Sequence, residues 1–492
     1  MGSLNRKVAV GAFWTVSARL IIKGLGFIST IILARILIPS DFGLIALAMI
    51  TVAFFEIFTS FGFDLNIIQE KNVNNDTLNS AWTCKLIGGS LLMTLIVVFS
   101  FFSHQFFDEK NIQELIFAVA FIPIIRSFHN IGFVLHRKEL ELKKEFNLEV
   151  YAKISSFIVT ISSALYLQNF WALVIGIYIN ELVRCFLSYV MHPFRPSPSL
   201  IEAKKLFKFS KWLLLSNLVI FINHKITDMI VAQKAGVGQL GHYTIGYEIS
   251  NLPTTEIVFP LSRALFPAFS KVKNDLEHLR ELFINFTQFI IMLAAPISFI
   301  LALCSTELVT ILLGEKWLPV IPVISLLAFY GLIRSSIQNI GSIFIALGRP
   351  DLPFKISVIR LFFIIPLLLH FVPQYGAEGG ALSVLICAFI TSPIGLYIVK
   401  NKLNIANLML CKTYLPPILA CMFAYLITNY VSLLIFQYTN MIFLAILKVL
   451  FFATIYFVII SIYSKFFDKS YIYNSIIAKL KSRVAQRLAV LK

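Results

Sequence analysis

Two basic residues, Arg19 and Lys23, interrupt the apolar stretch WTVSARLIIKGLGF at residues 14–27. If this stretch is helical, residues four apart share one face and lie about 6 Å apart along the axis. A cation in the middle of a lipid-facing helix costs roughly 2.5–3.5 kcal/mol. The spacing therefore predicts that both side chains face an internal aqueous cavity or an anionic partner.

The composition of the chain indicates that such stretches cross a membrane. Of its 492 residues, 58% are hydrophobic and 14% are charged. The mean hydropathy is +0.84, far above that of a soluble globular chain. Many apolar stretches are long enough to span about 30 Å of hydrocarbon. We therefore predict an all-α polytopic membrane protein with about fourteen transmembrane helices, at residues 8–35, 41–67, 78–103, 112–135, 147–169, 170–192, 210–235, 239–268, 279–305, 319–345, 352–373, 377–400, 412–434 and 441–464.

Lys and Arg residues are distributed unevenly between alternate loops. With the N-terminus inside, 27 of them fall in cytoplasmic segments and 4 in the opposite loops. This asymmetry predicts that both termini are cytoplasmic. It also explains much of the net charge of +17 without a nucleic-acid partner. The basic tail at 465–492 is either an amphipathic helix on an anionic leaflet or a solvated tail.

Eleven basic residues remain inside the predicted spans. Arg19 and Lys23 lie near the middle of the first span, and four others fall in the cytoplasmic third of spans three to six. For Lys85 and Arg184 the alternative is that the side chain extends to the lipid headgroups. The candidate ligand-binding cations of the first half are Arg19, Lys23, Lys85, Arg126, Lys153 and Arg184.

Acidic partners for these cations are few in the first half. Glu56 and Asp64 lie in the second span, and Glu181 lies three residues before Arg184, with which we expect it to pair. The first half is thus expected to keep an unneutralised cationic interior. Such an interior suits a strongly anionic ligand, and phosphate is the anion that Arg and Lys bind best.

The second half has a different balance of charge. Lys225 and Asp228 are three apart on one predicted helix and are expected to pair. Asp228, Glu248 and Glu256 are candidates for carrying protons or sodium ions. The alternative is that these acids only neutralise the basic residues of the same half, Arg263, Arg334 and Arg360.

A weak internal repeat relates the two halves. A shift of 198 residues aligns Trp14 with Trp212 and Gly43 with Gly241. Six helices separate the two copies, so both run in the same direction, about an axis along the membrane normal. We predict two six-helix bundles, a linker and two extra helices, with boundaries at 1–192, 193–211 (cytoplasmic linker), 212–400, 401–464 (helices 13 and 14) and 465–492.

Several motifs carry a resemblance that covers nearly the whole chain. They are ILARILIPSDFGLIALA at the junction of the first two spans, SFGFDLNIIQEK (60–71), LFPAFSKVKND (265–275) and LLGEKW (312–317). With the fourteen-span layout, they resemble polysaccharide exporters of the multidrug, oligosaccharidyl-lipid and polysaccharide flippase superfamily. The colanic-acid-type branch is the nearest.

The resemblance implies a function. Such proteins move an undecaprenyl-pyrophosphate-linked oligosaccharide from the cytoplasmic to the outer leaflet of the bacterial inner membrane by alternating access. This transport serves exopolysaccharide or lipopolysaccharide biosynthesis, so polymerases or ligases of the same pathway are possible partners. Family members carry cations in an N-terminal cavity, where the six basic residues fall in this sequence.

Other classes of protein remain to be weighed. A lipid-II-type flippase of cell-wall synthesis would share the basic cavity and stays the main alternative. A multidrug antiporter that exports organic cations would need an acidic cavity. The chain has no G-x-x-x-x-G-K-[ST], H-E-x-x-H or C-x-x-C motif. We therefore expect neither an enzyme nor a bound metal or cofactor, and we expect transport to draw on an ion gradient, the membrane potential or consumption of the product.

Overall fold

The computed structural model describes residues 2–59, 62–70, 72–107, 109–204, 211–435 and 440–466. Ten helices within these ranges are long and apolar enough to cross a membrane. The prediction of an all-α polytopic membrane protein is therefore confirmed. The chain forms two compact units, Met1–Thr244 (unit 1) and Ile245–Lys492 (unit 2). Most of the predicted basic tail lies outside the described residues.

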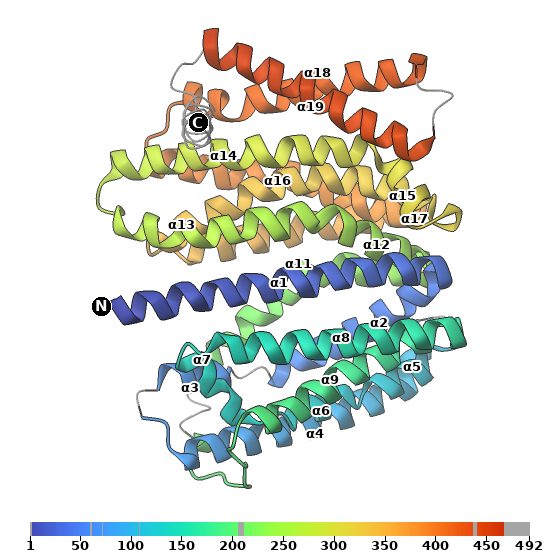
Figure 1. Ribbon diagram of the computed structural model, residues 1–492, viewed down its shortest axis with the longest axis vertical. Helices are drawn as coiled ribbons and strands as arrows, with labels where there is room; N and C mark the ends of the chain where they lie inside the picture. The colour runs from blue at the N-terminus through green and yellow to red at the C-terminus, as the bar shows by residue number, and fades with distance from the viewer. Residues whose placement is uncertain are drawn as a thin grey trace, which may run out of the picture. The chain divides into compact units, whose positions relative to one another are not determined.

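Unit 1 is a bundle of long helices with several short ones (Figure 1). Helix α1 packs along α8, α8 packs along α9, and α4 packs against α5 and α6. The helices of unit 1 are α1 (Gly2–Ile36), α2 (Pro39–Glu56), η1 (Ile57–Thr59), α3 (Phe63–Gln69), α4 (Asn75–Phe106), α5 (Ile112–Val119), α6 (Ile122–Ser127), η2 (Ile131–Phe133), α7 (Val134–Lys138), α8 (Leu142–Leu167), α9 (Trp171–Met191), α11 (Lys211–Ala235) and the start of α12 (Val237–Pro253).

One span of unit 1 is broken. The segment Ile112–Ser127 and the segment Ile131–Lys138 together pass as one membrane span, but they meet at an angle of 62°. Pro123 stands in the first turn of α6, where its missing N–H leaves no helical hydrogen bond unmade. The short helices thus place the end of α6 and the turn after it inside the bundle, where polar side chains replace the lost helical bonds.

The start of α2 follows from its sequence. Pro39 occupies the first turn, and the Asp41 carboxylate accepts a hydrogen bond from the backbone N–H of Ile38 at 3.1 Å. This local arrangement closes an N-terminal hydrogen bond that the helix would otherwise leave open. It fixes the direction in which α2 leaves the turn after α1.

Gly43 of α2 meets Gly241 of α12 at a backbone-to-backbone contact. A Cβ added to Gly43 would lie 1.8 Å from the carbonyl oxygen of Val237, and one added to Gly241 would lie 1.8 Å from that of Pro39. The shift of 198 residues aligns Pro39 with Val237 and Gly43 with Gly241. The contact therefore has local twofold symmetry, and this symmetry matches the predicted repeat.

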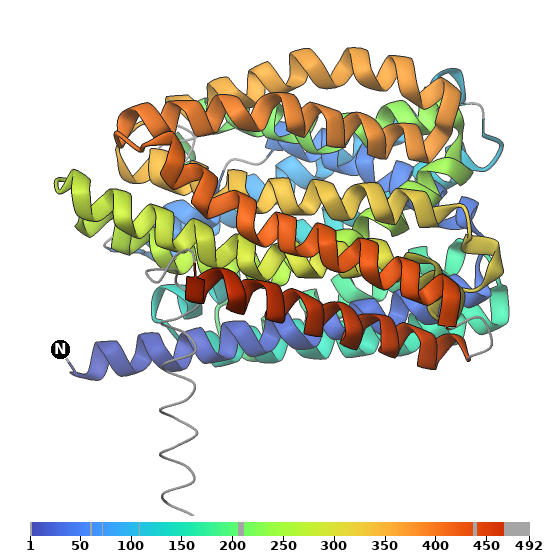
Figure 2. The same ribbon diagram turned by 90° about the horizontal axis from the view of Figure 1, so that it is seen from above.

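Unit 2 is built around α14, which packs against α16 and α18. Figure 2 shows α19, the red helix, running along α18. Buried apolar residues of α14, α18 and α19 form one core, and those of α13, α14, α16 and α17 form another. The remaining helices of unit 2 are η3 (Thr254–Val258, a π-helix), α13 (Phe259–Lys271), α14 (Leu276–Leu303), α15 (Ser305–Leu312), η4 (Glu315–Trp317), α16 (Val320–Ala346), α17 (Asp351–Lys402), α18 (Asn407–Ile435) and α19 (Met441–Phe466).

Helix α17 covers two of the predicted spans. Gly376 has φ 55° and ψ −127°, which breaks the helix sharply between them. A Cβ on the nearby Gly379 would lie 2.2 Å from the carbonyl oxygen of Phe371, so the two legs of α17 meet closely at the break. Glycine is needed here because other residues rarely adopt this backbone conformation.

The predicted number of fourteen spans is not confirmed. Within the described residues, the ten candidate spans count α17 as one helix, and the broken span brings the number to eleven. Neither α11 nor the α12, η3 and α13 series is among them, although both occupy predicted spans. The boundaries of the two predicted six-helix bundles likewise stay a prediction.

Candidate functional site

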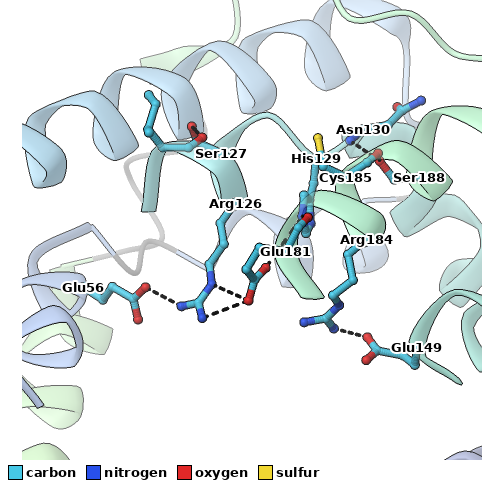
Figure 3. Close-up of polar contacts among 11 residues, drawn as sticks. Glu56, Arg126, Ser127, His129, Asn130, Glu149, Glu181, Arg184, Cys185 and Ser188 are labelled. Atoms are coloured by element: carbon cyan, nitrogen blue, oxygen red, sulfur yellow. Dashed lines mark hydrogen bonds and ion pairs between the residues drawn. The ribbon is translucent and has the colours of Figure 1, made fainter. Parts of the chain in front are cut away.

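Arg126 is the centre of an ion-pair cluster in unit 1 (Figure 3). Its Nη1 donates to an oxygen of Glu56 at 2.6 Å, and its Nε donates to an oxygen of Glu181 at 3.0 Å. The side chain of Glu181 is only 5% exposed. The arginine at the end of α6 therefore joins α2 to α9 through two carboxylates.

Close packing of α4 against α6 brings Lys85 near Arg126. Gly89 of α4 lies so near Ser127 that an added Cβ would come within 2.7 Å of its Cβ and Oγ. Beside this contact is a cavity of about 320 Å³, whose lining includes Lys85 and Arg126. Lys85 also donates to the Asp64 carboxylate at 2.5 Å. Two of the predicted cations thus line one cavity.

Arg184 has a different partner from the predicted one. Its Nη2 donates to Glu149 of α8, whereas Glu181, one turn earlier on α9, binds Arg126. The predicted pair between Glu181 and Arg184 is therefore wrong. Arg184 and Glu181 are close in sequence, but in Figure 3 their side chains reach toward different helices, α8 and α6.

The expected unneutralised interior is also wrong for these three cations. Lys85, Arg126 and Arg184 are paired with four carboxylates, those of Asp64, Glu56, Glu181 and Glu149. The sequence prediction overlooked Glu149 as a partner. Its position four residues before Lys153, on a predicted helix with a candidate cation, was the available signal.

The other three candidate cations belong to the pair formed by α1 and α8. The ring centroids of Trp14 and Phe146 are 4.9 Å apart, and Leu33 shares an apolar core with Ala164. These contacts show that the two helices run in parallel with nearly constant register.

The same register places Lys23 of α1 level with the turn of α8 that contains Lys153. Lys23 is exposed, and Arg19 and Lys153 are half-buried. Four residues separate Arg19 from Lys23, so the three side chains occupy two or three successive turns of adjacent helices. The six candidate cations of unit 1 therefore do not share one site: Lys85 and Arg126 line the cavity, Arg184 reaches Glu149 of α8, and the other three lie along α1 and α8.

The three acidic residues proposed for ion coupling lie on three different helices, α11, α12 and η3. Asp228 of α11 accepts a hydrogen bond from Lys225 at 2.8 Å, which confirms that predicted pair. Glu248 of α12 is exposed, and Glu256 lies half-buried in the π-helix η3.

The acids were also considered as partners for three arginines of the second half. Arg334 and Arg360 contact neutral groups instead: Arg334 donates to Tyr247 and Asn251, and Arg360 donates to Tyr330. Neutralisation by a carboxylate is therefore wrong for these two arginines within the described residues. The side chain of Arg263 lies outside the described part.

A buried ion pair in unit 2 went unnoticed in the sequence. Lys448 of α19 donates to Glu307 of α15 at 2.5 Å, and the two side chains are 11% and 5% exposed. Glu307 falls just after the predicted span at 279–305, so hydropathy places it outside the hydrocarbon core. The pair ties α19 to the rest of unit 2.

Long apolar helices, a broken span and charged side chains inside both units define a polytopic membrane protein of the transporter type. A family model described as polysaccharide biosynthesis protein matches residues 32–322, more than half of the chain. The chain therefore belongs to this family of polysaccharide biosynthesis proteins, and the family resemblance predicted from its motifs is confirmed.

The comparisons with individual proteins agree. The chain is 29% identical to the lipopolysaccharide biosynthesis protein WzxC of Escherichia coli (strain K12) over 407 residues, which cover 80% of this chain and 81% of WzxC. Its fold is similar to that of the lipid II flippase MurJ in an inward closed conformation, with a TM-score of 0.73, 16% identity, and coverage of 92% and 99% of the two chains.

A further structural neighbour is an inward-facing multidrug transporter of the MATE family, in the MOP superfamily. Its TM-score is 0.58 at 15% identity, with coverage of 80% of this chain and 94% of that one. Both structural likenesses show the fold alone. The prediction of a transporter rather than an enzyme agrees with these comparisons.

Proposed function

We propose that this protein is a flippase that moves a lipid-linked oligosaccharide repeat unit across the membrane by alternating access. The lipid carrier is undecaprenyl pyrophosphate, and the exported unit is used in exopolysaccharide or lipopolysaccharide synthesis. Polymerases or ligases of that pathway consume the product on the far side. The family match over residues 32–322 is the observation that carries the proposal.

The physical problem for such a protein is the pyrophosphate. Transferring its charge through hydrocarbon without compensation is prohibitive. Arg19, Lys23 and Lys153 supply cations along α1 and α8. Lys85 and Arg126 supply cations at the cavity of unit 1, and Arg184 supplies one beside Glu149 of α8. We assign the deepest contact with the pyrophosphate to Arg19 and Lys23, because both lie near the middle of the first predicted span.

Proteoliposomes carrying a lipid-linked glycan test this function. Arg19→Gln and Lys23→Gln should each slow the appearance of glycan in the far leaflet at least about tenfold. Arg35→Gln is the matched control, because Arg35 is in the last turn of the same helix. Wild-type rates in an Arg19→Gln, Lys23→Gln double variant would overturn the assigned roles, and no flipping by the wild-type protein would overturn the function.

A lipid-II-type flippase is the second candidate, and the TM-score of 0.73 to MurJ supports it. The same liposomes can be loaded with lipid II in place of the lipid-linked repeat unit. Faster movement of lipid II would favour the second candidate. We expect the repeat unit to move faster, because the family matched is that of polysaccharide biosynthesis.

The orientation is part of the proposal. We propose that the protein lies in the bacterial inner membrane with both termini and the linker at 193–211 in the cytoplasm, as the distribution of Lys and Arg predicts. A fluorescent reporter fused after Lys492 should be active. Alkaline phosphatase activity at the same position would reverse the orientation.

We propose that the membrane potential is the larger driving force. It favours outward movement of an anion by about 2.3 kcal/mol per charge per 100 mV. Protons or sodium ions carried by Asp228, Glu248 or Glu256 would add to it. Flipping should follow an imposed potassium-diffusion potential with proton and sodium gradients held at zero. Dependence on an ion gradient instead, lost in Glu248→Gln or Glu256→Gln, would make these acids the coupling site.

A further inference from the structure

Unit 2 holds two arginines near the middle of membrane-length helices. Arg334 is the fifteenth residue of α16, which begins at Val320, and Arg360 is the tenth of α17, which begins at Asp351. Both side chains are half-buried. A guanidinium at this depth is costly unless protein groups, water or a ligand compensate its charge.

The contacts of both arginines are made with neutral groups. Arg334 donates through one nitrogen, Nη1, to the Tyr247 hydroxyl at 3.0 Å and to the Asn251 side-chain oxygen at 2.7 Å. Arg360 donates through Nη2 to the Tyr330 hydroxyl at 3.3 Å and lies 5.9 Å from the centroid of that ring.

One tyrosine connects the two arginines. The Tyr247 hydroxyl that accepts from Arg334 is also within electrostatic range of Arg360. Tyr330 and Asn251 are buried, with 6% and 9% of their surface exposed. The five side chains therefore form one polar cluster from α12, α16 and α17, which we call the arginine–tyrosine cluster.

No carboxylate within the described residues forms an ion pair with either arginine. This differs from Lys448 of the same unit, whose ammonium group has the Glu307 carboxylate at 2.5 Å. The positive charge of the cluster is thus solvated by dipoles and an aromatic face rather than cancelled.

Both guanidinium groups also have nitrogens that make no hydrogen bond to the described residues. Among the described residues, Nε and Nη2 of Arg334 and Nε and Nη1 of Arg360 make no hydrogen bond. None of these nitrogens belongs to the fully buried polar atoms that lack a partner. They are therefore accessible, and a guanidinium has five N–H groups with which to bind oxyanions in a planar, two-pronged way.

The hydroxyl of Tyr330 adds a further donor. The Tyr330 hydroxyl accepts a hydrogen bond from Arg360, which leaves its own O–H proton available to a ligand oxygen. Tyrosine rings and amides also suit the apolar and hydroxyl-bearing faces of a sugar. The chemistry of the cluster matches an anionic oxygen group attached to, or next to, a carbohydrate.

We propose that the arginine–tyrosine cluster is a binding subsite for an oxyanion of the transported molecule. The inference rests on the proposed flippase function, and it assigns to unit 2 a role in binding substrate. The same donors would take a carboxylate carried by an acidic sugar or a phosphate oxygen of the lipid carrier, and these two sources can be separated experimentally.

Equilibrium binding to the full-length protein in lipid nanodiscs provides the test, with inorganic pyrophosphate, glucuronate and neutral glucose as probes. Glucuronate binding lost in Arg334→Gln and Arg360→Gln would assign the subsite to an acidic sugar. A component of pyrophosphate binding that is lost in the same variants, beside the binding by the cations of unit 1, would assign the subsite to the lipid phosphate. In either case we expect affinity to fall at least about tenfold.

Three variants serve as controls. Arg349→Gln should leave affinity unchanged, because Arg349 is an exposed arginine already paired with Asp351 at the start of α17. Arg126→Gln removes the central cation of unit 1, so anion binding that is lost in this variant but kept in Arg334→Gln and Arg360→Gln belongs to unit 1 and not to the cluster. Tyr330→Phe keeps the ring but removes a hydroxyl, so it should weaken binding several-fold even if the arginine variants fold poorly.

The proposal is overturned if neither anion binds saturably, if glucose binds as well as the anions, or if Arg334→Gln, Arg360→Gln and Tyr330→Phe all bind like the wild type. Failure of the flippase function is distinguishable from these results. A protein that binds an anion through the cluster but moves no lipid-linked glycan would refute the function and keep the site.

Discussion

Arg126 in unit 1 and Arg334 in unit 2 solve the same physical problem in different ways. Each places a guanidinium inside a bundle of membrane-length helices, where an uncompensated charge is costly. Arg126 is held by the carboxylates of Glu56 and Glu181. Arg334 is held by the hydroxyl of Tyr247 and the amide of Asn251.

The difference lies in what remains for a ligand. The charge of a cation with two carboxylate partners is cancelled. An incoming anion can bind it only if it displaces one carboxylate or if one carboxylate becomes protonated. A cation with neutral partners keeps its charge and some of its N–H groups. We therefore expect Arg126 to contribute mainly to stability and Arg334 mainly to binding, and the predictions below test this contrast.

The largest effect is expected from Lys448. This cation lies in unit 2 but has a carboxylate partner, so it shows whether the loss of stability follows the type of partner or the unit. Lys448→Met leaves the buried Glu307 carboxylate without its ammonium partner, which should cost about 3–5 kcal/mol. The melting temperature of the variant in detergent should be markedly lower than that of the wild type. The double variant Lys448→Met, Glu307→Leu should recover most of it. An unchanged melting temperature in Lys448→Met would contradict the expectation that cations paired with buried carboxylates contribute to stability.

Arg126→Gln should destabilise the protein by a smaller amount, about 2–4 kcal/mol, because its side chain is 36% exposed. The cause is the Glu181 carboxylate, which stays buried without a cation. Adding Glu181→Gln should restore part of the melting temperature. Arg334→Gln is the comparison variant, and its melting temperature should stay near that of the wild type. Equal losses in both arginine variants would remove the distinction between them.

Gly43→Ala separates backbone packing from these side-chain networks. Its Cβ would overlap the Val237 carbonyl oxygen, so α2 and α12 must move apart, at a cost of about 1–3 kcal/mol. Export should fall strongly while both ion-pair networks persist. Gly238→Ala is the control on α12, since nothing lies within 4 Å of its added Cβ. Equal export by both variants would show that the close approach is dispensable.

The smallest effect is expected at the Lys225 and Asp228 pair. The lysine side chain is 39% exposed and the aspartate side chain 16% exposed, whereas Glu181 beside Arg126 is 5% exposed, so losing this pair should cost less, about 1 kcal/mol. Lys225→Met should shift the melting temperature only slightly. A large shift would mean that exposure does not weaken ion pairs in this protein.

The sequence predicted the helices better than their partners. Apolar length is a local property, so the spans and the break at Gly376 could be found from hydropathy and composition. The number of spans was harder, because the structure joins two predicted spans in α17 and because α11 and the α12, η3 and α13 series do not pass as candidate spans within the described residues. The span predicted at 112–135 is present but bent by 62°. A bend inside a span depends on packing against other helices, so hydropathy alone does not predict it.

Ion-pair partners could not be predicted because they depend on which helices meet. Arg126 and Glu181 are 55 residues apart, and the nearer Arg184 misled the prediction. The neutral surroundings of Arg334 were missed for the same reason, since Tyr247 is 87 residues away. Lys225 and Asp228, three residues apart on one helix, could be paired from spacing alone.

The contact of Gly43 with Gly241 has a thermodynamic consequence. Glycine has no side chain to immobilise, so this part of the contact forms without a loss of rotamer entropy. It also buries little apolar surface and offers only weak Cα–H to oxygen attractions. The two backbones can therefore separate and meet again at little free-energy cost, and the fit is lost as soon as either carries a methyl group.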